Sequence, residues 1–145
     1  MTLRLLVDNS VIQRLAQPAV YLAWQRLLER GDIATCLPTL LEAGYSARSA
    51  SAHGALLELE QHAKIMLLPA PEIAHIAIDI QSALFAAGKG RAAGVSDLQI
   101  AATAIHHSTP ADPVIVVHYD ADFDHMASAE PRLRAEWVVP RTTAD

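Results

Sequence analysis

The sequence has little of what several classes of protein require. It contains one cysteine, Cys36, in 145 residues, which excludes a disulfide framework and a cysteine-rich zinc site. Charged residues make up only 19% and hydrophobic residues 52%, so the chain is too apolar to be intrinsically disordered. No apolar run reaches the roughly 20 residues of a membrane span, and the run at the N-terminus stops at Asp8. We therefore expect a cytoplasmic protein with one domain over residues 1–140 and a loose C-terminal tail at 141–145.

Positive charge is also scarce. The chain has 11 Lys and Arg against 16 Asp and Glu, a formal net charge of −5. A protein that binds nucleic acid through electrostatics alone has a basic surface, so this composition does not favour that class. The seven histidines would change the balance only below neutral pH.

Short apolar runs alternate along the chain with segments of helical periodicity. Val114–Val117 is a continuous β-branched run, which is the strongest strand signal in the sequence. This alternation is typical of an α/β domain, and we expect a mostly parallel central sheet of about five strands with helices on both faces. Strands are predicted at 3–7, 33–36, 65–68, 114–117 and 137–139; helices are predicted after Asp8 as far as 15, and at 19–30, 39–48, from Ser49 or Ser51 to 63, 72–87, 97–107 (with Ser96 as its N-cap) and 122–127.

Aspartates follow two of the predicted strands. Asp8 comes directly after the first, while Asp120 and Asp122 follow Val114–Val117. Ligands of an open parallel sheet bind beyond the carboxyl ends of its strands. If both strands are central, these acids meet at one edge of the sheet.

Two further acids are candidates on weaker grounds. Asp97 lies in the first turn of a predicted helix, where an acid that only complements the helix dipole is the more usual case. Glu42 is the one acid in an apolar helical segment, and its alternative role is an exposed carboxylate beside Arg48 or Lys64.

A set of four or five carboxylates suits a magnesium site. Mg²⁺ prefers oxygen ligands in octahedral geometry. One or two such ions can stabilise the entering and leaving oxygens at a phosphorus centre and lower the pKa of a bound water. A glycine-rich segment, Gly88–Gly94, does not offer a nucleotide site instead, because it lacks the spacing of a phosphate-binding loop and follows a helix.

The acids and the residues around them resemble the signature of PIN-domain ribonucleases, and among these the VapC toxins of bacterial toxin–antitoxin pairs. The resemblance spans nearly the whole chain in the family's order. Its segments are Leu6–Val11 (LVDNSV), Thr39–Glu42 (TLLE), Ser96–Ala104 (SDLQIAATA), His118–Phe123 (HYDADF) and Trp137–Pro140 (WVVP). The sequence departs from the family at Asn9, where threonine is common, and at His118, where threonine or serine is common.

The resemblance implies a metal-dependent endoribonuclease toxin that hydrolyses phosphodiesters of structured RNA, such as transfer or ribosomal RNA, with Mg²⁺ or Mn²⁺ and an activated water. It also implies a homodimer and an antitoxin protein that blocks the site. Carried over to this sequence, the metal ligands are Asp8, Glu42, Asp97 and Asp120; Asp122 is a fifth acid, and Ser10 and Ser96 are supporting residues.

The five carboxylates carry five negative charges, which equals the formal net charge of the whole chain, −5. The metal site itself therefore accounts for the acidity of the chain. RNA would then be held by Arg48, Lys89 and Arg91, unless these are solvated surface charges. The helices at 19–30 and 52–63 are candidates for an antitoxin groove, unless their apolar residues face the sheet. Two other functions stay open: a catalytically silent PIN-like module that binds RNA or protein, and a metal phosphoesterase for a small substrate.

Overall fold

A computed structural model describes residues 2–145. Five parallel strands form one sheet in the order β3-β2-β1-β4-β5, so β1 and β4 are central, as the placement of the acids required. The strands are β1 (Arg4–Val7), β2 (Asp32–Cys36), β3 (Ile65–Leu67), β4 (Val114–His118) and β5 (Ala135–Trp137). The predicted α/β class is confirmed, and each strand begins and ends within two residues of its expected bounds.

Seven helices in the described chain connect and cover the strands. They are α1 (Asn9–Ile12), α2 (Pro18–Arg30), α3 (Leu37–Tyr45), α4 (Ala50–Ala63), α5 (Pro71–Ala86), α6 (Val95–His107) and α7 (Asp122–Ala129). Ser49 caps α4 as one of the two predicted residues, its side chain accepting the Ala52 N–H at 3.0 Å. The prediction that Ser96 caps α6 was wrong. Gly94 takes the extended N-cap position, and Ser96 therefore lies inside the first turn.

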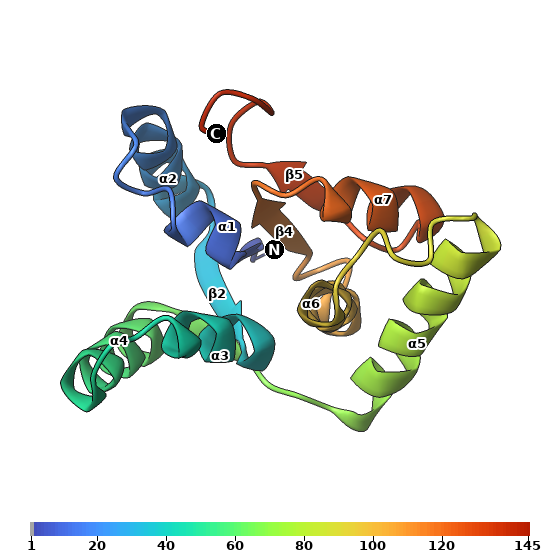
Figure 1. Cartoon of the computed structure of the whole chain (residues 1–145), viewed down its shortest axis with the longest axis horizontal. Helices are drawn as coiled ribbons and strands as arrows, with labels where there is room; N and C mark the ends of the chain where they lie inside the picture. Colours follow the sequence, from blue (N-terminus) through green and yellow to red (C-terminus); the bar gives the residue numbers. More distant parts are fainter. Residues whose placement is uncertain (1) are drawn as a thin grey trace.

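The side chains of the strands alternate between two apolar cores. Leu6 and Val116 pack with α5, α6 and α7 on one face, whereas Leu5 and Val117 pack with α1 and α2 on the other. Figure 1 shows α5, α6 and α7 grouped away from α1 and α2. The strands are nearly continuous hydrophobic runs because both faces of the sheet are covered.

The segment 141–145 is not the loose tail that we expected. Ala144 is buried, and its carbonyl accepts hydrogen bonds from Arg14 Nε at 3.1 Å and Gln17 Nε2 at 3.0 Å. The Tyr119 hydroxyl accepts the Ala144 N–H at 2.9 Å and donates to Asp145 Oδ1 at 2.7 Å. The tail is held by polar contacts with residues more than 20 positions away, which local sequence does not reveal. Within residues 2–145, no helix is long and apolar enough to cross a membrane.

Candidate metal centre

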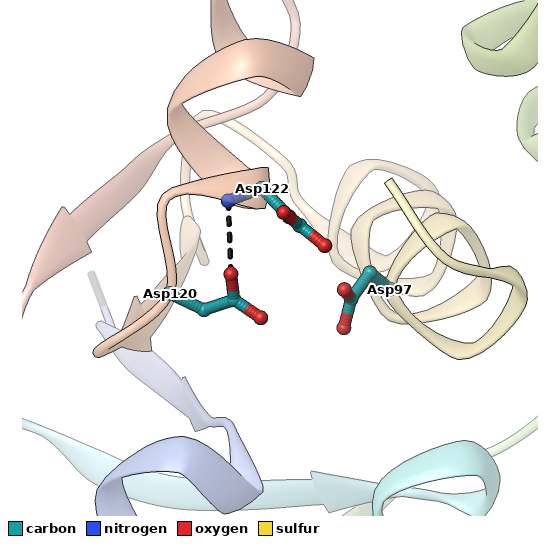
Figure 2. A group of neighbouring side chains, drawn as sticks. All are labelled: Asp97, Asp120 and Asp122. Carbon is teal, nitrogen blue, oxygen red and sulfur yellow. Dashed lines mark hydrogen bonds between the residues drawn. The ribbon is translucent and has the colours of Figure 1, made fainter. Parts of the chain in front are cut away.

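Three aspartates from two separate segments of the chain converge beside the sheet. Asp97 lies in the first turn of α6, Asp120 lies between β4 and α7, and Asp122 begins α7. Each offers a carboxylate oxygen within 4.8 Å of the other two (Figure 2). Asp120 Oδ1 also accepts the backbone N–H of Asp122 at 2.9 Å, which fixes its orientation. Sequence alone could not show this convergence, because it depends on how α6 packs against α7.

Asp8 is the most buried of the predicted acids. It directly follows β1 and caps α1, and only 4% of its surface is exposed. Its Oδ2 accepts the Ser10 backbone N–H at 3.1 Å and the Ser10 hydroxyl at 2.6 Å. Its Oδ1 is buried and has no hydrogen-bond partner among the described residues. An ionised carboxylate with one buried, unpartnered oxygen is a group that a cation would stabilise.

Glu42 lies on α3. Its carboxylate stays outside the 4.8 Å group, and so does that of Asp8. The charges of Glu42 and Asp120 nevertheless act on Asp8. Burial is the main cause that raises the pKa of Asp8, and these two carboxylates add to it, while the Ser10 hydrogen bonds oppose it. Asp8, Glu42 and Asp120 therefore share one electrostatic environment.

The electrostatics of the centre favour a cation. Burial raises the pKa of Asp97 from its ordinary value near 3.8 to about 8, and repulsion from the neighbouring aspartates contributes. Carboxylates that cannot all ionise on their own can do so around a divalent ion. Carboxylate oxygens are also the ligands that Mg²⁺ and Mn²⁺ prefer. The residues present thus fit a hard divalent cation.

Two uncharged side chains, Ser10 and His118, fix the positions of Asp8 and Asp120 through hydrogen bonds. The Ser10 hydroxyl accepts the Tyr119 N–H at 2.9 Å, so one hydroxyl ties Asp8 to the end of β4. His118 Nδ1 accepts the Asp120 N–H at 3.1 Å. The His118 ring is fully buried, and this burial lowers its pKa to about 4.

The remaining predicted residues lie outside the group of three aspartates. Ser96 lines a hollow next to it, together with Glu42. Arg48, Lys89 and Arg91 are all exposed, and the last two line a separate hollow beside Phe85. The structure does not bring these three basic residues into the acidic cluster.

The hollow beside the centre is bounded by α1, α3 and the first turn of α6. It measures about 510 Å³, and its lining includes Asn9, Gln13, Leu41, Glu42, Tyr45 and Gln99. Asn9 is buried, and its Nδ2 donates to the Thr39 carbonyl at 3.4 Å. Sequence reasoning missed this hollow. Its local signals were Glu42 itself and the neighbours of two other acids, Asn9 beside Asp8 and Ser96 beside Asp97.

Comparison with known proteins identifies the fold family. The PIN domain family matches residues 5–129, most of the chain. The chain is 41% identical to Ribonuclease VapC21 of Mycobacterium tuberculosis over 145 residues, which cover 99% of this chain and 100% of that protein. This chain belongs to the PIN-domain family and to its VapC branch. It is also 37% identical to Ribonuclease VapC51 of the same species, with both chains covered completely.

Solved VapC-type structures share the fold. VapBC-1 from nontypeable Haemophilus influenzae aligns with a TM-score of 0.72 at 14% identity, covering 94% of this chain and 98% of that one. VapBC2 from Rickettsia felis, bound to a DNA fragment from its promoter, aligns with a TM-score of 0.70 at 15% identity over the same shares. These structures confirm the fold, and the family match with the two relatives confirms the resemblance to PIN-domain ribonucleases of the VapC type.

Proposed function

We propose that the chain is a metal-dependent endoribonuclease toxin that hydrolyses phosphodiesters of RNA and is inhibited by an antitoxin protein. The observation that carries the proposal is the convergence of Asp97, Asp120 and Asp122 beside buried Asp8, in a chain whose relatives are named ribonucleases. PIN membership and the acidic centre together support a hydrolase over a purely structural protein.

In this proposal Asp8, Glu42, Asp97 and Asp120 hold Mg²⁺ or Mn²⁺, and Asp122 is either a further ligand or a group that orients one. Bound metal would supply charge stabilisation at the phosphorus centre and lower the pKa of water. The chain's own residues prepare the site. Ser10 holds Asp8 in place, so that its unpartnered Oδ1 stays available.

Substrate binding is proposed to rely on few basic residues. Arg48, Lys89 and Arg91 are exposed and could contact phosphates that flank the cut. With so few cations and a net charge of −5, we expect modest RNA affinity with a shallow dependence on salt.

An antitoxin and a second copy of the chain are the proposed protein partners. The solved neighbours are VapBC assemblies, which favours an antitoxin partner here. Tyr21, Leu22 and Leu28 on α2 and Leu59 on α4 are large apolar residues that remain exposed, as an antitoxin surface would require. We also propose that the chain forms a homodimer.

The test maps cleavage ends on total cellular RNA. Purified wild type and the Asp97→Asn variant are compared in Mg²⁺, in Mn²⁺ and with EDTA. We expect discrete new 5′ ends that require both the metal and Asp97, with 5′-phosphate and 3′-hydroxyl products. If wild type gave no more new 5′ ends than the variant, the proposed ribonuclease activity would be rejected. That result would favour the silent binding module or a phosphoesterase for a small substrate.

A further inference from the structure

The hollow beside the acidic centre is contiguous with it. Asn9 and Ser96 line the hollow, and they directly follow Asp8 and precede Asp97 in the sequence. Glu42 belongs both to the lining and to the predicted carboxylate set. A substrate group that enters the hollow is therefore next to the bond that the proposed function cleaves. Its volume of about 510 Å³ falls within the usual 300–1,000 Å³ of pockets for small organic ligands.

The lining does not suit a phosphate group. Among the described residues that line it, Glu42 is the one with a charge, and no lysine or arginine takes part. Amide and hydroxyl side chains and apolar groups supply the rest of the surface. Gln13 and Gln99 carry amides that can both donate and accept hydrogen bonds. Such a surface is complementary to a neutral ring with polar edges, which is the chemistry of a nucleobase.

One side chain of the hollow is exposed to an unusual degree. Tyr45, at the end of α3, is 93% exposed, and Leu41, one turn earlier on the same face, is 62% exposed. The opposite face of α3 packs normally, since Leu40 and Ala43 are buried. Proteins recognise unpaired RNA by stacking its bases on exposed aromatic rings.

We propose that this hollow binds the base of an unpaired nucleotide adjacent to the scissile phosphate, with Tyr45 as its stacking platform. The inference rests on the proposed function and deepens it. It predicts that the protein cuts in loops or single strands, because a base within a duplex cannot leave its stack to enter the hollow without unpairing.

The binding test uses the four nucleoside 5′-monophosphates and ribose 5-phosphate, which lacks the base, each titrated with Mn²⁺ present. We expect at least one nucleotide to bind about 5-fold or more tightly than ribose 5-phosphate, the lower end of what base stacking contributes. Tyr45→Ala should remove this difference and Tyr45→Phe should keep it. The side chain is almost wholly exposed, so neither change should disturb folding. His75→Ala, an exposed ring on α5, serves as a surface control.

The kinetics of RNA cleavage distinguish a failure of the base site from a failure of the proposed ribonuclease function. Tyr45→Ala should lower kcat/KM about 5- to 150-fold at the wild-type cut sites, while Tyr45→Phe stays close to wild type. Unchanged kcat/KM in Tyr45→Ala, or equal binding of nucleotides and ribose 5-phosphate, would overturn the base site and leave the hollow to an antitoxin side chain. An absence of wild-type cleavage dependent on metal and Asp97 would instead overturn the proposed function.

Discussion

The imidazole of His118 accepts the backbone N–H of Asp120 at Nδ1, over 3.1 Å. The ring is fully buried, and its centroid lies 5.0 Å from that of Phe123. Because burial lowers the pKa of His118 to about 4, the ring is neutral near neutral pH and Nδ1 is free to accept. A buried histidine therefore fixes the backbone that carries one of the proposed metal ligands.

Two amide substitutions test this contact. His118→Asn would place a side-chain oxygen near the position of Nδ1, whereas the longer side chain of His118→Gln would place its amide near the position of Nε2. We therefore expect His118→Asn to keep Mn²⁺ affinity near that of wild type and His118→Gln to lower it about 10-fold, as loss of an outer hydrogen bond commonly does. Calorimetric titration with Mn²⁺ measures both. Equal losses in the two variants would show that ring packing, rather than the Nδ1 contact, supports the site.

The positions of the strands along the chain could be predicted because β-branched and apolar runs mark buried parallel strands. Their order in the sheet, which puts β1 beside β4, depends on long-range pairing and came from the structure. Asp8 and Asp120 follow β1 and β4, so the sequence predicted that both would meet at one sheet edge if these strands were central, a condition that the pairing of β1 with β4 meets. The approach of Asp97 could not be derived in this way, because it depends on the packing of α6 rather than on local pattern. The capping of α6 was mispredicted for a related reason, since Gly94 offers no side-chain signal for an N-cap.

The raised pKa of Asp97 makes the stability of the metal-free protein depend on pH. Its pKa in the folded chain is about 8, above the ordinary 3.8, so folding favours the protonated form. The stability contributed by neutral Asp97 is complete below about pH 4 and is lost as the pH rises through about 8. Because Asp97 is only half-buried, we expect the loss between pH 5 and 9 to be on the order of 1 kcal/mol.

Urea unfolding in EDTA across this pH range measures the effect in wild type and Asp97→Asn. The variant lacks the titrating group, so its free energy of unfolding should fall less as the pH rises. Added Mg²⁺ or Mn²⁺ should restore wild-type stability at high pH, because the cation favours the ionised carboxylates. Parallel pH profiles for the two proteins would show that Asp97 does not titrate abnormally.

The Tyr119 hydroxyl is expected to hold the C-terminal segment to the domain. Tyr119→Phe removes an acceptor for the buried Ala144 N–H and a donor to Asp145, while the ring beneath the Arg14 guanidinium remains. An unsatisfied buried N–H costs about 1–3 kcal/mol, so global stability should fall by about 1 kcal/mol or the segment should detach. Hydrogen exchange at Ala144 would then accelerate. Tyr45→Phe removes an exposed hydroxyl and is the matched control; similar exchange in both variants would contradict the assignment.

Two glycines should respond in opposite directions to alanine. A Cβ at Gly31, between α2 and β2, would lie 2.5 Å from the Leu3 carbonyl oxygen, so the backbone would have to move. Its φ of −171° is accessible to any residue, and the cost is therefore steric, about 1–3 kcal/mol. A Cβ at Gly54, within α4, meets nothing within 4 Å, and helix propensity predicts a gain of about 0.5–1 kcal/mol. Urea midpoints measure both changes, and a Gly31→Ala variant as stable as wild type would show that the approach of Leu3 to the α2–β2 junction is not tight.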